Sequence, residues 1–140
     1  MSDTRLILQL PGAELESIEQ DGDDITLKFS QAYIVQEMEG AFEDSLWTQA
    51  VELIIRGMKL TGDLPQCPCV IGGGDLINNI FTYRDHAPLP IKWHGDVSCT
   101  FTIAANNESF TLKGASIQLK HTANPRYIKH ISKDHKITGE

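Results

Sequence analysis

Residues 97–112, VSCTFTIAANNESFTL, decide the fold class of this chain. Apolar residues alternate with Ser and Thr as far as Ile103, and the same alternation resumes at Phe110. A period of two places successive side chains on opposite faces of a β-strand. Residues 104–108 lie between the two runs and contain an Asn-Asn pair, which is typical of a tight turn. The stretch therefore predicts an antiparallel hairpin, which describes architecture and carries no chemistry.

Alternation of the same kind predicts further strands on both sides of this hairpin. Gly57 and Gly114 each separate two apolar runs of opposite phase, and a glycine at a phase change indicates a β-bulge. Residues 45–60 also carry apolar side chains three to four positions apart, which leaves a helix as the alternative there. Trp47 and two adjacent isoleucines favour a strand. The other predicted strands cover residues 6–10, 13–20, 25–35, 76–83 and 91–93.

Together these patterns predict about seven to nine strands joined by short links, with no helix long enough for a parallel crossover. The expected fold is mainly β, an antiparallel up-and-down β-barrel-like meander, because closure removes the exposed edges of a large sheet. A two-sheet β-sandwich is the alternative. Asn124-Pro125 is a helix start signal, and apolar side chains follow it at helical spacing. We therefore expect a short C-terminal helix over residues 125–132.

Length and cysteine content indicate one domain in a reducing compartment. A chain of 140 residues has the length of a single domain. We predict an antiparallel β domain over residues 1–132 and a frayed C-terminal tail over residues 133–140. Three cysteines are an odd number, which argues against a secreted disulfide framework. The N-terminal apolar stretch is too short for a signal peptide, so a cytoplasmic location is expected.

The charge is acidic overall and unevenly distributed. The formal net charge is −7, which disfavours nucleic acid as a partner. No apolar run approaches the ~20 residues of a membrane helix, so no membrane association is expected. Residues 13–44 hold ten acidic residues and one base, whereas residues 113–140 hold six bases and two acidic residues. These two regions would attract each other within one fold or between two copies of the chain.

Two short motifs lack the neighbouring residues that a metal site or a phosphate-binding loop needs. Cys67-Pro68-Cys69 spaces its thiols more tightly than zinc sites do, and no second pair of ligand residues follows at metal spacing. Residues 72–75 are Gly-Gly-Gly-Asp, but the lysine and the helix that a phosphate-binding loop needs do not follow. We interpret the first motif as a structural loop and the second as a flexible loop. Neither a metal nor a cofactor is predicted.

Aromatic side chains are the best candidates for a binding site, because small-molecule pockets use aromatic residues with a few polar groups. We expect Trp47, Phe81, Trp93 and Phe101 to line a cavity. The predicted function is that of a small non-catalytic binding module. Its partner would be a small ligand or another protein chain, a second copy of this chain included.

A small enzyme is the alternative. Arg84-Asp85-His86 lies at one predicted strand end, and His94 and Asp96 lie at another. These side chains would act as general acid and base if the sheet brought the two turns together. No Gly-x-Ser-x-Gly elbow presents a nucleophile. The sequence therefore leaves open whether the protein is an enzyme.

Overall fold

Ten β-strands and no helix make up residues 4–132, which are the residues that the computed structural model describes. The prediction of a mainly β fold is confirmed. The strands are β1 (Thr4–Asp21), β2 (Asp24–Met38), β3 (Glu43–Arg56), β4 (Lys59–Thr61), β5 (Cys69–Asn78), β6 (Phe81–Arg84), β7 (His86–Pro88), β8 (Lys92–Ile103), β9 (Ser109–His121) and β10 (Arg126–Ser132).

The hairpin predicted from residues 97–112 is formed by β8 and β9. Phe101 lies opposite Phe110, and Thr100 lies opposite Thr111 in the antiparallel register. The two threonine hydroxyls are 2.8 Å apart and hydrogen-bond across the strands. Opposed side chains of this kind stabilise a hairpin on both of its faces. The face that carries the two buried phenylalanines packs in the core.

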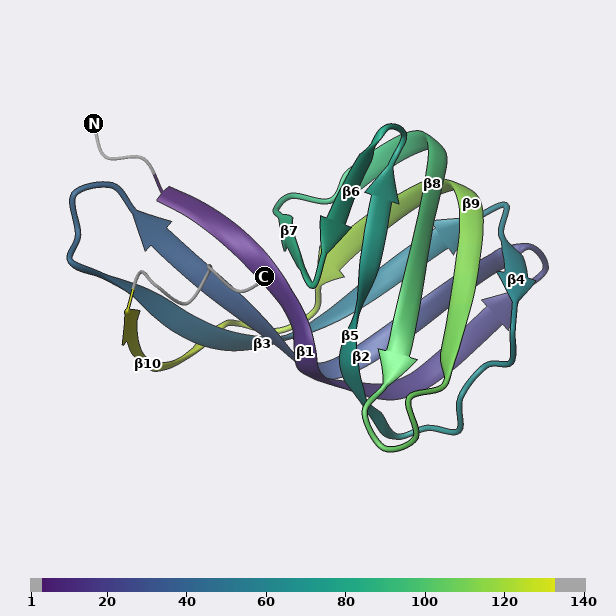
Figure 1. Ribbon diagram of the computed structural model, residues 1–140, viewed down its shortest axis with the longest axis horizontal. Coiled ribbons are helices and arrows are strands. Elements are labelled where there is room, and N and C mark those ends of the chain that lie inside the picture. The colour runs from purple at the N-terminus through teal and green to yellow at the C-terminus, as the bar shows by residue number, and fades with distance from the viewer. Residues whose placement is uncertain (1–3, 133–140) are drawn as a thin grey trace.

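Six strands close into an antiparallel barrel (Figure 1). The strands β1, β2 and β3 form one meander, and β5, β8 and β9 form a second one. Pairing of β1 with β5 joins the two meanders on one side, and pairing of β3 with β9 joins them on the other. The connection from β3 to β5 therefore crosses one end of the barrel. Closure confirms the barrel over the two-sheet sandwich.

The short C-terminal helix predicted over residues 125–132 is wrong. Residues 126–132 form β10, which pairs antiparallel with the first half of β3, with Tyr127 opposite Trp47. Beyond the barrel that half of β3 has β2 on one side only, so its other edge has backbone groups to satisfy. Pairing across the sheet outweighs the local helical spacing of the apolar side chains.

The first three strands are longer than the barrel and continue beyond it (Figure 1). We call this extension the wing. It consists of residues 4–9 of β1, 33–38 of β2 and 43–48 of β3, together with β10. Strand β7 pairs with β1 across Ile7–Gln9 and so lies where the wing leaves the barrel.

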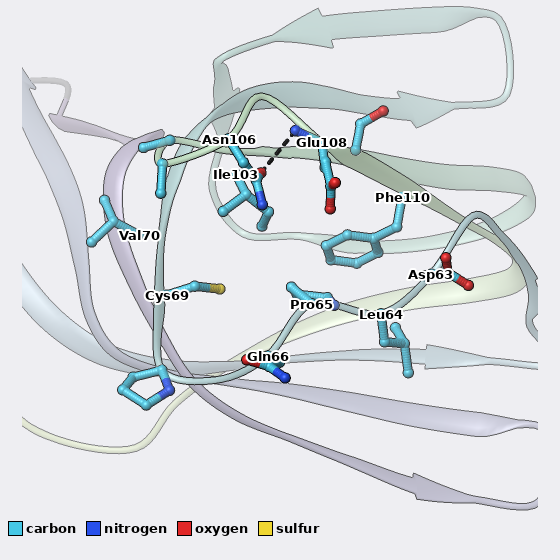
Figure 2. A pocket seen from close by; sticks show the side chains of 14 residues that line it. Asp63, Leu64, Pro65, Gln66, Cys69, Val70, Ile103, Asn106, Glu108 and Phe110 are labelled. Atoms are coloured by element: carbon cyan, nitrogen blue, oxygen red, sulfur yellow. Dashed lines mark hydrogen bonds between the residues drawn. The ribbon is translucent and has the colours of Figure 1, made fainter.

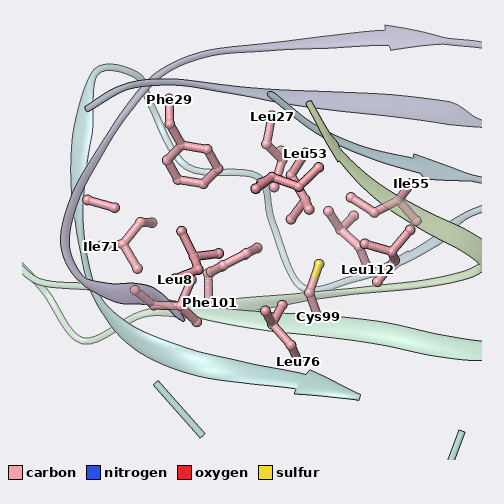
Figure 3. Close-up of a cluster of buried hydrophobic side chains, with 14 of the residues drawn as sticks. Leu8, Leu27, Phe29, Leu53, Ile55, Ile71, Leu76, Cys99, Phe101 and Leu112 are labelled. Carbon is pink, nitrogen blue, oxygen red and sulfur yellow. The ribbon is translucent and has the colours of Figure 1, made fainter. Parts of the chain in front are cut away.

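The interior of the barrel is filled by side chains from both meanders (Figure 3). Phe101 has no exposed surface, and its ring centroid lies 6.2 Å from that of Phe29 and 5.7 Å from that of Phe110. Strands in a small barrel alternate inward and outward side chains, so one apolar set per strand suffices to fill it. The largest fully buried side chains are Phe101, Phe110, Leu15, Ile25, Leu27, Leu53, Ile55, Ile71, Leu76, Ile91, Leu112 and Ile117.

The interpretation of residues 72–75 as a flexible loop is wrong, because they lie inside the barrel strand β5. Gly74 pairs with Phe101 of β8, and a Cβ at Gly74 would overlap the carbonyl oxygen of Thr100. Glycine is used here because the backbones of β5 and β8 approach each other closely. The three glycines therefore belong to the barrel wall and not to a ligand-binding loop.

The two phase changes have different structural causes. Around Gly114 the inward side chains change phase, and the pairing with β8 shifts register there. His94 pairs with Ser116 and Val97 with Gly114, so the extra residue of this bulge lies on β8 and not at Gly114 itself. The bulge predicted at Gly57 is wrong. Strand β3 ends at Arg56, and Gly57 has a φ of 64°, which is the backbone conformation of a turn.

Candidate functional site

The four aromatic residues predicted to line one cavity lie in different environments. Phe101 is enclosed in the barrel core, whereas the Phe81 side chain is 58% exposed at the start of β6. Trp93 stacks on Tyr83 with ring centroids 5.5 Å apart. Trp47 lies on the wing. No ring contact among residues 4–132 joins two of these four predicted residues.

The side chains proposed as acid and base are engaged separately. Asp85 Oδ1 accepts a hydrogen bond from the backbone N–H of Gly74 at 2.9 Å, which fixes that carboxylate against the barrel wall. Arg84 Nε lies 3.2 Å from Asp75 Oδ1. The backbone N–H of Asp96 donates to Asn79 Oδ1.

His86 pairs with β1 through β7, and His94 lies on β8. In the part of the chain that the structure describes, no hydrogen bond or ion pair connects the two turns.

A cavity of about 680 Å³ lies at one end of the barrel (Figure 2). Residues 63–70 wall one side of it, and the turn between β8 and β9 walls the other. The thiol of Cys69 points into this space, beside Pro65 and Phe110. Within residues 4–132 no three His, Cys, Asp or Glu side chains are grouped to hold a metal ion.

Burial keeps the cysteine thiols protonated. Burial raises the pKa of Cys99 to about 12. For Cys69, burial and the neighbouring Cys67 raise the pKa to about 11. Burial also raises the pKa of Cys67, opposed by a hydrogen bond with Cys69. Because the thiolate is the nucleophile, these three cysteines are poorly reactive at neutral pH.

Alkylation kinetics test this arrangement. With iodoacetamide at about pH 8, we expect Cys67 and Cys69 to react about tenfold more slowly than an unfolded control, because few thiolates are present. Cys99 should react only after denaturation, since it is fully buried. Raising the pH should speed the reaction of the first two. Mass spectrometry of peptides from native and denatured samples measures each rate, and rapid native labelling of Cys99 would contradict this account.

A groove of about 460 Å³ runs along one face of the wing. Leu6, Ile34 and Trp47 come from three neighbouring strands and form its apolar floor. Trp47 Nε1 donates to Ser45 Oγ at 2.9 Å, and the ring meets Tyr127 edge-on at 5.5 Å between centroids. These contacts hold the indole in place.

The end of the groove nearest the barrel is polar. Gln49 Oε1 lies 2.7 Å from His121 Nδ1, and Gln49 Nε2 donates to the carbonyl of Ala123 at 2.6 Å. These bonds tie the segment that precedes β10 to β3. The groove is lined by residues of β1, β2, β3 and β9 together with Pro125, and β10 borders it through the contact of Tyr127 with Trp47.

Large apolar side chains are concentrated at the accessible parts of the wing. Phe42, in the turn between β2 and β3, is 97% exposed. The other exposed large apolar residues of the wing are Leu6, Met38, Tyr127 and Ile128. Exposed apolar side chains that gather on one part of a protein mark a candidate interaction site.

Three side chains on the opposite face of the wing are buried. Val35, Glu37 and Asp44 are at most 5% exposed there, and Arg5 Nη2 lies 2.7 Å from Glu37 Oε1. The accessible apolar surface thus lies on the groove face, at the tip and along β10. The sequence analysis singled out only Trp47 among these residues. The sequence signal that could have pointed to Phe42 is an aromatic residue within the acidic segment of residues 39–44.

Comparisons with known proteins give no indication of function, so the exposed surface of the wing is the main guide to it. No protein family, curated protein or solved structure matches the chain. Residues 4–132 contain no helix long and apolar enough to cross a membrane.

Proposed function

We propose that this protein is a non-catalytic binding module that binds another protein chain through the wing. The observation that carries the proposal is a set of exposed apolar side chains on an extension that the barrel does not need for closure: Leu6, Met38, Phe42, Tyr127 and Ile128, with the half-buried Trp47 in contact with Tyr127. Interfaces are enriched in aromatic residues and methionine at their centres.

A protein partner fits this surface better than a small ligand does. The barrel interior, where a small molecule would bind, is filled by Phe101 and its neighbours. The groove beside Trp47 is open, and the exposed side chains of Met38 and Phe42 lie toward the tip of the wing. A protein surface is large enough to cover both the groove and the tip, whereas a small molecule would leave most of this area in water.

We propose neither nucleic acid nor a membrane as the partner, because the net charge is −7 and charged residues lie next to the exposed apolar ones in the sequence. The cytoplasmic location and the division of the chain at residue 132 remain predictions. The tail over residues 133–140 lies outside the described residues.

Substitution of Phe42 tests the proposal. Affinity capture with the wild-type protein should identify a partner, and binding is then measured by calorimetry with that partner purified. We expect Phe42→Ser to weaken the affinity about tenfold or more, since buried aromatic anchors dominate interfaces. The fold should be unchanged within about 0.5 kcal/mol, because the side chain is exposed.

Ile80→Ser is the matched control. Ile80 is 89% exposed in the turn between β5 and β6, away from the wing. This variant should bind the identified partner like the wild type. Equal affinity of the Phe42→Ser variant and the wild type would refute the wing as the binding surface.

A further inference from the structure

Several strand edges of this sheet have no strand neighbour among residues 4–132, and those of β4, β6 and β7 are only three or four residues long. Two longer edges belong to β1 and to β10, which ends the strand order and has β3 as its one neighbour among the described strands. Strand β1 pairs with β7 through residues 7–9 and with β5 through Glu14 and Leu15, so residues 16–21 have β2 as their only neighbour. Unpaired backbone N–H and C=O groups along such edges form a template for pairing with another strand.

The two edges carry opposite charge. Arg126 and Lys129 are exposed on the seven-residue strand β10. The free part of β1 carries exposed Glu16, Glu19 and Asp21. These side chains lie on edges of similar length, so strand pairing would bring the opposite charges together.

Most of these charges are not neutralised within the fold. Among the described residues, Glu19 has Lys28 Nζ at 2.9 Å, but neither Arg126 nor Lys129 forms an ion pair, and neither does Asp21. The charges are therefore available to a partner of opposite sign.

We infer that the partner is a second copy of this chain, whose β1 edge at residues 16–21 pairs with β10 of the first. The inference rests on the proposed function and names its partner. Tyr127 and Ile128, which β10 exposes, would become covered in this contact. Main-chain hydrogen bonds between the two edges provide affinity, and the charged side chains fix which edges meet.

Charge also selects the symmetry of the assembly. Pairing β10 with β10 would place Arg126 and Lys129 against their own copies, and pairing β1 with β1 would do the same for its acidic residues. A lysine on an edge strand opposes pairing with a like edge and favours an acidic one. The contact is therefore head-to-tail, because β10 lies in the wing and the free β1 edge lies on the barrel (Figure 1). Made twice about a two-fold axis, such a contact closes a dimer, and made once per pair of copies it produces a ring or an open filament.

Charge reversal with complementation tests this geometry by sedimentation velocity. The wild type should associate at about 50 mM salt and about tenfold more weakly at about 500 mM, because salt screens exposed charges. Arg126→Glu with Lys129→Glu should abolish association, and so should Glu16→Lys with Asp21→Lys. An equimolar mixture of the two double variants should associate again, since each basic edge then meets an acidic one.

Lys59→Glu with Lys113→Glu is the matched control. It changes the net charge as much as the β10 variant does, but Lys59 and Lys113 face each other on β4 and β9 of the barrel. This control should associate like the wild type. A mixture of the two edge variants that stays monomeric overturns the head-to-tail contact, and so does a wild type that is monomeric at about 100 μM in low salt.

The two proposals can fail separately. If the wild type is monomeric but Phe42→Ser loses an identified partner of another kind, self-assembly is refuted and the proposed function stands. If the wild type associates as expected and Phe42→Ser binds every identified partner normally, the edge contact stands and the wing tip is excluded from the function.

Discussion

Phe101→Ala is expected to lower the free energy of unfolding by about 3–5 kcal/mol. The side chain has no exposed surface, and its ring contacts Phe29 of the first meander and Phe110 of the second. Truncation removes apolar burial and leaves a cavity between two halves that closed strands prevent from collapsing. Chemical denaturation followed by tryptophan fluorescence measures the effect.

Phe81→Ala is the control for Phe101→Ala. It removes the same side chain from a site that is 58% exposed, so the free energy of unfolding should change by about 0.5 kcal/mol or less. Equal losses in the two variants would mean that the barrel interior does not dominate stability. A loss near 1 kcal/mol for Phe101→Ala would indicate a core that readily collapses around the missing ring.

Gly74→Ala is expected to lower the free energy of unfolding by about 3 kcal/mol, at the upper end for overpacking. A methyl group at this position would overlap the carbonyl oxygen of Thr100, and that obstacle is backbone. The pairing of β5 with β8 must separate locally to admit it, so ladder hydrogen bonds weaken. Thermal and chemical denaturation report the loss.

Gly40→Ala separates steric overlap from the backbone freedom of glycine. Gly40 has a φ of 85°, and a Cβ there would meet no atom within 4 Å. Its substitution should cost about 1 kcal/mol, from backbone strain alone. If Gly74→Ala costs no more than Gly40→Ala, the close approach of β5 and β8 is not what requires glycine.

Local patterns predicted which residues lie in strands better than where strands begin and end, because alternation reports only which face of a strand is buried. The strands predicted at residues 6–10 and 13–20 are one strand, β1, and the strand predicted at residues 76–83 contains the turn between β5 and β6. The hairpin around residues 104–108 was found because its two strands are adjacent in sequence. The helix predicted at residues 125–132 failed because its partner in the sheet lies about eighty residues earlier, at Trp47. Spacing within seven residues contains no information about that pairing.

The candidate site could be predicted only in part. Trp47 was identified as an aromatic in an amphipathic strand, but its neighbours Leu6, Ile34 and Tyr127 come from three other strands. Phe101 has the same residue type as Phe42, yet one fills the core and the other lies in water. Aromatic character alone does not distinguish the two, because burial depends on the strands that pack around each residue.

By itself, the sequence determined that this protein is an antiparallel β domain with strands of alternating polarity and an uneven charge. Those properties depend on residues close together in the chain. Only the tertiary structure decided which strands close the barrel, that residues 72–75 belong to its wall, and that β10 completes a wing. These outcomes depend on backbone pairing between distant segments, whose hydrogen bonds do not depend on side-chain identity and therefore leave little trace in the sequence.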